Sequence, residues 1–235
     1  MSKRRKNNVM ELKIMQVASR MFLEKGYTNT TISAIGDELN MSKGHIMFYF
    51  SSKEHMLAKM VQMLCDFREG QLKEGLEKQV DPWLMAGMEL LSMVLICEES
   101  PSARDFYQSC YSYPSTLDII RKNDIQRAKT LYSEYCKDWT DEQFTEIETL
   151  MSGIEYSTIM TTEHSPSVEY RIEGAFHAFL LLYHVPEERR TELIKKLYAI
   201  DREGIGLRAM REFENYIIEE QKKEMLARTD GEQEW

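Results

Sequence analysis

Helix boundaries are the feature that most constrains how this 235-residue chain can fold. Three dipeptides, Asp81-Pro82, Ser100-Pro101 and Ser165-Pro166, pair a helix-capping side chain with a proline, which suits the first helical position. Tyr113-Pro114 and Val185-Pro186 mark two further boundaries. Between the boundaries apolar residues recur at helical spacing, and strand signals are nearly absent. The sequence therefore predicts an all-α fold.

Two more helix starts have the spacing of a capping box, in which two side chains three residues apart satisfy exposed backbone amides. These starts lie at Ser51 and Thr140. We expect one long helix over Lys53–Lys78 and another over residues 82–97, which is apolar nearly all round its C-terminal half and should be central. Only Arg228–Trp235 is typical of a disordered tail.

Composition excludes several classes of protein. With 43% hydrophobic residues the chain can bury a core. No apolar run approaches the roughly 18 to 20 residues that a membrane span needs, and none follows the basic start as a secretory signal requires. The four cysteines stand far apart without a Cys-x-x-Cys pair, which disfavours a disulfide framework or structural zinc. We therefore expect a cytoplasmic protein.

No enzyme signature, cofactor motif or metal site stands out. A phosphate-binding glycine loop, a nucleophile elbow and a catalytic carboxylate pair are not found. His177 and His184 lie seven residues apart, which is longer than the spacing of four that binds zinc well on a helix. We expect no enzymatic activity, no cofactor and no metal.

The net charge of −9 conceals an asymmetry along the chain. Residues 1–60 carry ten Lys/Arg against five Asp/Glu, whereas the remainder carries 20 against 34. A basic segment joined to an acidic body indicates that the first 60 residues meet a polyanion. On charge alone, a solvated basic tail is the simpler interpretation.

The most informative stretch is Thr30–Phe50, which begins with a short amphipathic helix. Its apolar face is formed by Ile32, Ile35 and Leu39. Asn40 follows, one of the few residues other than glycine that tolerate a positive φ angle. We therefore expect a sharp turn after this helix.

A second short helix follows the turn. Ser42 can cap it, Ile46 and Phe50 should point inward, and Tyr49 should lie near the edge. The remaining residues are left to point outward; they are Lys43, Gly44, His45, Met47 and Phe48. Two short helices joined by a tight turn within about twenty residues make a helix-turn-helix.

These motifs, in this order, resemble the DNA-binding domain of the TetR family of transcriptional regulators. The matching segments are Phe22-Leu-Glu-Lys-Gly-Tyr27, Thr30-Thr-Ile-x-x-Ile35, Met41-Ser-Lys-Gly44 and Tyr49-Phe-x-x-Lys-Glu54. The resemblance implies a DNA-binding domain over residues 1–54 and a helical ligand-binding and dimerisation domain over residues 55–227, before the tail at 228–235. It covers about a quarter of the chain.

The family resemblance also implies a function: a ligand-responsive regulator, a repressor, that binds a palindromic operator as a homodimer. The residues implied to contact DNA are Thr30, Thr31, Ser42, Lys43, Gly44, His45, Phe48, Tyr49 and Lys53. Of these, Lys43, Gly44 and His45 should lie nearest the bases, and Lys53 should contact phosphate. The sequence departs from the family pattern at Asn40, Met47 and Phe48.

Sixteen methionines and many aromatic residues suggest an adaptable apolar pocket for a small-molecule effector. The candidate ligand-binding residues are Trp83, Met88, Phe106, Tyr107, Cys110, Tyr111, Tyr132, Tyr156 and Phe176. For any single one of them, ordinary core packing is the simpler interpretation.

Small residues predict the dimer interface. Gly174 and Ala178 lie four apart, and Gly153 has a similar role in the preceding helix, so partner helices can approach closely. We expect residues 141–163 and 167–184 to form the dimer interface, and the family resemblance implies that they build a four-helix bundle across a two-fold axis. Two alternatives remain open: an all-α small-molecule-binding or scaffold protein without DNA binding, and a thiol or metal sensor.

Overall fold

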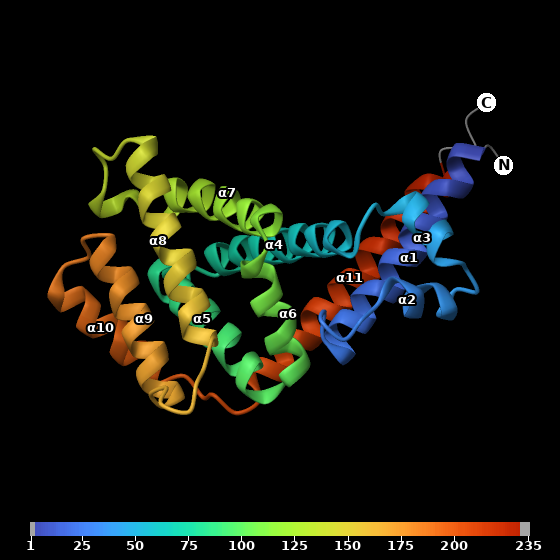
Figure 1. The fold of residues 1–235 in the computed structure, drawn as a ribbon. Helices are drawn as coiled ribbons and strands as arrows, with labels where there is room; N and C mark the ends of the chain where they lie inside the picture. The colour runs from blue at the N-terminus through green and yellow to red at the C-terminus, as the bar shows by residue number, and fades with distance from the viewer. Residues whose placement is uncertain (1–2, 231–235) are drawn as a thin grey trace.

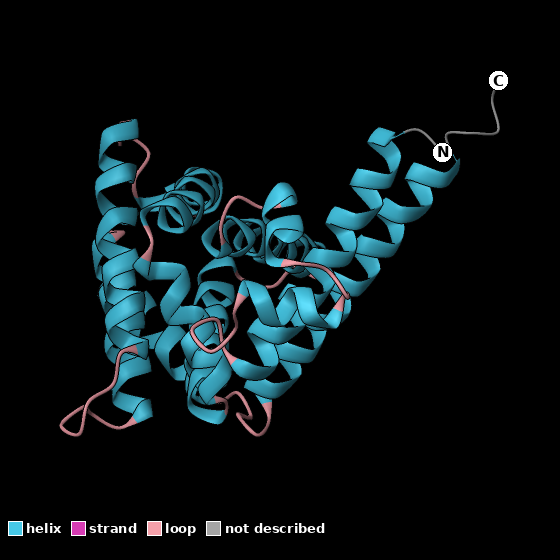
Figure 2. Ribbon diagram, turned by 45° about the vertical axis from the view of Figure 1, so that its right-hand side comes forward, coloured by secondary structure: helices cyan, strands magenta, loops and turns pink. Residues whose placement is uncertain are grey.

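The structure is a computed structural model that describes residues 3–230, with the side chains of residues 9–223. Every regular element in this part of the chain is a helix, and no strand occurs among the described residues (Figure 2). The elements are α1 (Lys3–Lys25), α2 (Ile32–Glu38), α3 (Lys43–Tyr49), α4 (Lys53–Glu77), α5 (Pro82–Glu99), α6 (Pro101–Ser112), α7 (Pro114–Leu131), the 3₁₀ turn η1 (Ser133–Tyr135), α8 (Asp141–Ile159), α9 (Val168–Leu182), α10 (Glu187–Tyr198) and α11 (Ile205–Asp230). The all-α prediction is confirmed.

The helices form a small N-terminal head and a larger body (Figure 1). The head contains α1, α2 and α3, and the single long helix α4 leads from it into the body. At the far end of the body lie α8, α9 and α10. The last helix, α11, crosses α5 and then returns to lie along α1. Among described residues, no helix is both long and apolar enough to span a membrane.

The predicted central helix is confirmed as α5, whose Leu91 and Val94 are buried. Its start is held by Asp81, whose carboxylate accepts hydrogen bonds from the amides of Trp83 and Leu84 at 2.9 and 3.4 Å. Such capping satisfies amides that a helix leaves unbonded at its first turn. Local sequence signals therefore set the position of the element around which the body packs.

Other predicted helix starts agree with the structure or differ by one or two residues. The capping box at Thr140 is present in full. Helix α4 starts at Lys53, as predicted, but its cap is Ser52 and not Ser51, because the Ser52 hydroxyl accepts from the amide of His55 at 3.0 Å. Ser165-Pro166 lies in the loop before α9 and does not cap it, because the Ser165 hydroxyl bonds the amide of Thr162.

Both expected domain boundaries fall near or within helices. The predicted division at residue 54 lies in the first turn of α4, which continues without interruption from head to body. Residues 228–230, expected in a loose tail, belong to α11, and residues 231–235 lie outside the described part of the chain.

Candidate nucleic-acid interface and effector cavity

The turn between α2 and α3 is built as the sequence predicts. Asn40 adopts a φ of +53°, in the left-handed region that few non-glycine residues tolerate. The carbonyl of Gly36 accepts from the amides of Leu39 and Met41 at 3.0 and 2.8 Å. A Cβ atom on Gly36 would lie 2.5 Å from the Met41 carbonyl oxygen, so only glycine fits there. Sequence reasoning missed Gly36, because its position in α2 gave no sign that the Met41 carbonyl approaches it so closely.

Helix α3 is anchored on one face and free on the other. The Ser42 hydroxyl accepts from the amide of His45 at 3.2 Å and caps the helix. Ile46 and Phe50 are fully buried, as predicted. The predicted outward-facing residues are all exposed; they are Lys43, Gly44, His45, Met47 and Phe48.

Two details of the exposed face bear on what it can bind. Phe48 is 70% exposed, which is unusual for a large aromatic residue. Its ring centroid lies 5.2 Å from that of Tyr49, which in turn lies 5.8 Å from that of His45. A Cβ atom on Gly44 would meet nothing within 4 Å, so the backbone there is open to approach.

Thr30 differs from the expectation that it contacts phosphate. Its side chain is buried, and its hydroxyl donates to the carbonyls of Met21 and Gly26, at 3.1 and 2.8 Å. Its amide donates to the Tyr27 carbonyl at 3.1 Å. The hydroxyl and the amide of Thr30 therefore both bond carbonyls at the end of α1 and in the turn after it. Neither is free to contact phosphate, so the predicted phosphate role for Thr30 is wrong. Thr31 is exposed and caps α2, so its contact with DNA stays a prediction.

Lys53 also has an internal role that the sequence did not predict. Its ammonium donates to the carbonyls of Tyr27 and Thr30, at 2.8 and 2.9 Å, and lies 4.0 Å from the centroid of the Tyr27 ring. Burial lowers its pKa, opposed by the carboxylate of Asp105. Two of three ammonium hydrogens are thus used within the head, so Lys53 fixes the α1–α2 turn and has little left for phosphate.

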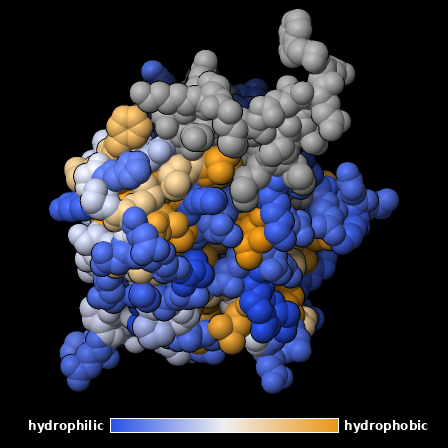
Figure 3. Space-filling model, turned by 90° about the vertical axis from the view of Figure 1, so that its right-hand side faces the viewer, coloured by the Kyte–Doolittle hydropathy of each residue, from blue (hydrophilic) through white to orange (hydrophobic). Residues whose placement is uncertain are grey.

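The end of the molecule that carries the head is shown in Figure 3. Hydrophilic residues dominate this face, with apolar residues between them. A polar, partly basic surface with aromatic groups among its cations is suited to a nucleic acid backbone and base edges.

The comparison with known families agrees with this geometry. Residues 14–60, from α1 through α3 into α4, match the model described as bacterial regulatory proteins, tetR family. Residues 14–60 are therefore similar to a tetR-family domain, the name used for them below.

Two curated proteins are similar to parts of this chain. An uncharacterised HTH-type transcriptional regulator of Bacillus subtilis (strain 168), YvdT, is 26% identical over 123 residues, 52% of this chain and 59% of that protein. A second from the same organism, YuxN, is 38% identical over 53 residues, 23% of this chain and 18% of that protein. This chain therefore spans less than two thirds of both relatives.

A solved structure was also found, that of the TetR family protein CprB from S. coelicolor A3(2). It covers 80% of this chain and 97% of CprB, with a TM-score of 0.45 and 16% sequence identity.

The tetR-family domain is joined to the body by more than α4. Asp105 of α6 accepts from the amide of Thr28 at 2.7 Å, and lies so near Gly26 that a Cβ atom there would be 2.7 Å from it. The rings of Tyr27 and Tyr113 meet edge to face at 5.7 Å. The α1–α2 turn therefore rests directly on the start of α6 and the junction that follows it.

A cavity of about 370 Å³ lies in the body beside these contacts. Three of the nine predicted ligand residues line it: Met88, Phe106 and Tyr107. Four methionines face it, as their abundance suggested; they are Met85, Met88, Met93 and Met210. The contributions of α4 and α11 to this lining were not predicted.

The other six candidates do not line this cavity. Trp83 packs against the rings of Tyr132 and Tyr183 in a solid aromatic cluster, with centroids 5.0 and 5.9 Å away. Tyr132 and Phe176 border only a second cavity of about 40 Å³, which is too small for an effector. Cys110, Tyr111 and Tyr156 line neither of these two cavities, nor a third of about 230 Å³ between α4 and α7.

The smaller cavity lies in a network of charged side chains that sequence reasoning also missed. Glu89 pairs with both Arg68 and Arg127, and Arg127 also pairs with Asp124 at 2.7 Å. Glu148 accepts a hydrogen bond from Tyr183, and Glu155 accepts one from Tyr111 at 2.9 Å. The ionisable groups come from α4, α5, α6, α7, α8 and the residue that follows α9, so the network ties the body together.

Burial raises the pKa of Glu148 to about 7, and the Asp124 carboxylate adds to the rise. Because the unfolded carboxyl ionises near pH 4.5, unfolding becomes easier as the pH rises from there to about 7. Burial also raises the pKa of the neighbouring Glu155 to about 7, so that carboxyl keeps part of the dependence. Glu148→Gln should therefore reduce the dependence and stabilise the chain at pH 8 by about 2 kcal/mol relative to wild type. Urea unfolding at pH 5, 6, 7 and 8 measures this, with exposed Glu146→Gln on the same helix as control. An unchanged pH slope in Glu148→Gln would contradict the assignment.

All four cysteines are buried as free thiols. Burial raises the pKa of Cys65 and Cys136 to about 11 and that of Cys97 to about 12, and it also raises that of Cys110. Thiols react as thiolates, so these environments disfavour the redox-sensing alternative. Among the described residues no group of three or more potential ligands is placed to hold a metal ion.

Proposed function

We propose that this protein is a transcriptional regulator, a repressor, that binds a palindromic DNA operator as a homodimer and responds to a small molecule held in its body. The observation that carries the DNA-binding proposal is the division of α3 into two faces. Ile46 is fully buried, whereas Lys43 and His45 are exposed. A helix held in this way can enter a major groove and keep its cation and imidazole free for base edges.

A binding experiment with Lys43→Ala tests the DNA-binding proposal. Duplexes selected from a random pool at low ionic strength, and DNA flanking the protein's own gene, serve as probes. We expect Lys43→Ala to weaken binding to the selected site by about tenfold, since a good base contact contributes about 1–3 kcal/mol. Binding to random duplex should fall less.

The control is Lys73→Ala. Lys73 is exposed on the same helix that leaves the head, about 30 Å from its first residue. Its removal should leave the affinity for the selected site unchanged. If the wild-type chain binds no duplex at low salt, DNA binding is excluded. If both lysine variants lose affinity equally, α3 is not the reading helix.

The proposed dimer interface is the outer face of α8 and α9. Along α8 the exposed residues Leu150, Gly153 and Met160 follow helical spacing. On α9 the exposed apolar or small residues are Tyr170, Gly174 and Leu181, and the polar residues Glu169 and His177 are exposed beside them. A Cβ atom on either glycine would meet nothing within 4 Å, so a partner helix has room to approach. Two apolar stripes with small residues in them are suited to a self-complementary four-helix contact.

Leu181→Glu should convert the dimer to monomers. A two-fold interface places both copies of a substituted residue in one contact, so the change buries two carboxylates. Sedimentation velocity at micromolar concentration should show a dimer for wild type and an increase of at least about 100-fold in dissociation constant, about 2.8 kcal/mol, for the variant. Leu76→Glu, at an exposed leucine on α4, should remain dimeric. A monomeric wild type would refute the interface.

The proposed response to a ligand uses the contacts between body and head. Phe106 and Tyr107 of α6 line the larger cavity, and Asp105 of the same helix holds the α1–α2 turn. A molecule that prefers one position of α6 would therefore favour one position of the head. Such differential binding is all that a shift in DNA affinity requires.

A further inference from the structure

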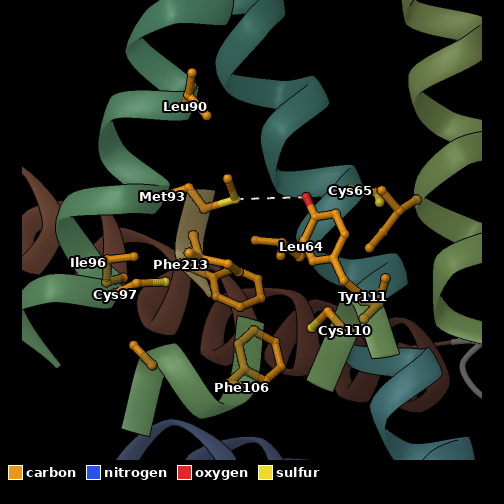
Figure 4. Packing of buried hydrophobic residues seen from close by; sticks show 14 of the residues in the cluster. Leu64, Cys65, Leu90, Met93, Ile96, Cys97, Phe106, Cys110, Tyr111 and Phe213 are labelled. Carbon is orange, nitrogen blue, oxygen red and sulfur yellow. Dashed lines mark hydrogen bonds between the residues drawn. The ribbon is translucent and has the colours of Figure 1, made fainter. Parts of the chain in front are cut away.

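The larger cavity has a roof that comes from the far end of the sequence. Ile205, Ala209 and Phe213 lie at intervals of four on one face of α11, and all three line the cavity. In Figure 4 Phe213 lies among the side chains of Leu64, Met93, Ile96 and Phe106, which line the same space. The Phe67 ring of α4 packs on Phe213 with centroids 5.5 Å apart. Helix α11 thus closes the cavity over α4, α5 and α6.

The same helix also reaches the head. Beyond the cavity α11 lies along α1 (Figure 1), and Leu23 of α1 is itself part of the cavity lining. Burial and the carboxylate of Glu24 on α1 raise the pKa of Glu214 on α11, as expected for facing acidic groups. A molecule in the cavity would therefore touch both the roof and a helix of the DNA-binding head.

The start of α11 is fixed against α5. A Cβ atom on Gly206 would lie 2.5 Å from the backbone nitrogen of Ile96, so the two helices cross with no side chain between them. Gly204, just before it, has a φ of +64° and turns the chain into the helix. The roof is therefore hinged at one end and rests on α1 beyond the cavity.

The chemistry of the lining indicates what the cavity can hold. Within the cavity the charged groups Arg68 and Glu89 pair with each other. Arg208 and Glu212 are exposed to solvent, and they bond a backbone carbonyl at 2.7 Å and the amide of Gln71 at 3.1 Å. The remaining lining is mostly aliphatic, aromatic and methionine side chains. A charge placed away from these two exposed groups would lose its hydration without gaining a free counter-charge.

Two hydroxyl groups in the lining have no hydrogen-bond partner among the described side chains and backbone, those of Tyr107 and Ser92. Burial raises the pKa of Tyr107, so its hydroxyl stays protonated and can donate. The volume of about 370 Å³ is within the range of small-molecule sites.

We propose that this cavity binds an uncharged, largely apolar molecule with one hydrogen-bonding group, and that α11 carries its occupancy to the head through α1. This inference rests on the proposed function only in treating the bound molecule as an effector of DNA binding. A bound molecule would fill the space between roof and floor, and would hold α11 and Leu23 in one arrangement. On release, the part of α11 between the Gly206 crossing and α1 would settle toward α4, which it already contacts through Phe213 and Glu212.

A matched pair of fluorescent probes tests the ligand class. N-phenyl-1-naphthylamine is uncharged and apolar with one N–H group, and 8-anilino-1-naphthalenesulfonate is the same molecule with an anionic sulfonate. We expect the full chain to bind the uncharged probe at least tenfold more tightly. Ala209→Trp, which fills the cavity from α11, should weaken that binding at least tenfold, whereas Leu207→Trp, at an exposed position of the same helix, should not. Ser92→Trp fills the cavity from α5 and replaces Ala209→Trp if that variant does not fold.

Amide hydrogen exchange of the same samples tests the coupling without DNA. The uncharged probe should slow exchange in α11 and in the second half of α1, and Ala209→Trp should abolish the difference. Three results would each overturn the inference. They are equal binding of the two probes, undiminished probe binding by Ala209→Trp or Ser92→Trp, and slowed exchange confined to α4, α5 and α6. If the chain bound the probe as expected but bound no duplex, the proposed function would fall and the ligand-site inference would stand. If it bound duplex normally but did not bind the probe, the ligand-site inference would fall and the DNA-binding proposal would stand.

Discussion

Replacing Arg127 by methionine should lower the free energy of unfolding by about 3 kcal/mol, the lower end of the range for breaking a buried ion pair. Its guanidinium pairs with Glu89 and Asp124, and its side chain is 19% exposed, which reduces the effect through solvent screening. Methionine keeps much of the volume and leaves Asp124 without its partner. Urea unfolding at pH 8 measures the loss.

Two variants control for the loss of charge as such. Arg20→Met removes a 43% exposed arginine that also pairs with two carboxylates, and it should change stability by less than about 1 kcal/mol. The double variant Arg127→Met, Asp124→Asn should recover part of the stability, because the unpaired carboxylate is gone. Equal losses for the two arginines, or no recovery in the double variant, would show that the network is not a buried ion-pair cluster.

The second large effect is expected at Gly36. An alanine there would place its Cβ atom 2.5 Å from a backbone oxygen of the turn, so the turn must shift. We expect a loss of about 1–3 kcal/mol in stability, typical of overpacking, and the loss of site-specific DNA binding because α3 is displaced. Thermal unfolding and duplex binding measure the two effects.

Gly44→Ala is the matched control for Gly36→Ala. At Gly44 a Cβ atom meets nothing, and alanine favours a helix, so stability should stay the same or rise by up to about 1 kcal/mol. Affinity for the selected duplex should nevertheless fall about tenfold, because the added methyl group occupies the space between backbone and bases. A Gly44→Ala variant that binds normally would refute close approach at this position, and a stable Gly36→Ala variant would refute the role of the turn.

The head could be predicted from sequence because its signals are local. The turn at Asn40, the cap at Ser42 and the buried positions Ile46 and Phe50 all lie within about ten residues of one another. Thr30 was expected to contact DNA, like Thr31, because the two threonines are adjacent at the start of the same helix. Only the tertiary structure shows that the Thr30 hydroxyl is buried and donates to carbonyls near the end of α1.

The body could be predicted only in outline. Helical spacing located most of its helices, but aromatic content does not show whether a space remains between side chains. Trp83 and Tyr132 therefore proved to be solid core, whereas Phe106 lines the cavity. The return of α11 to α1 joins segments nearly two hundred residues apart, and neither periodicity nor capping encodes such a contact.

The four covered thiols make the unmodified chain its own reporter of local opening. Alkylating reagents attack thiolates, so a protonated cysteine shielded from solvent is labelled only while its surroundings are transiently open. The cysteines are spread over separate elements: Cys65 on α4, Cys97 on α5, Cys110 on α6 and Cys136 after η1. The labelling rate at each position therefore measures how often that part of the body separates, without any inserted tag.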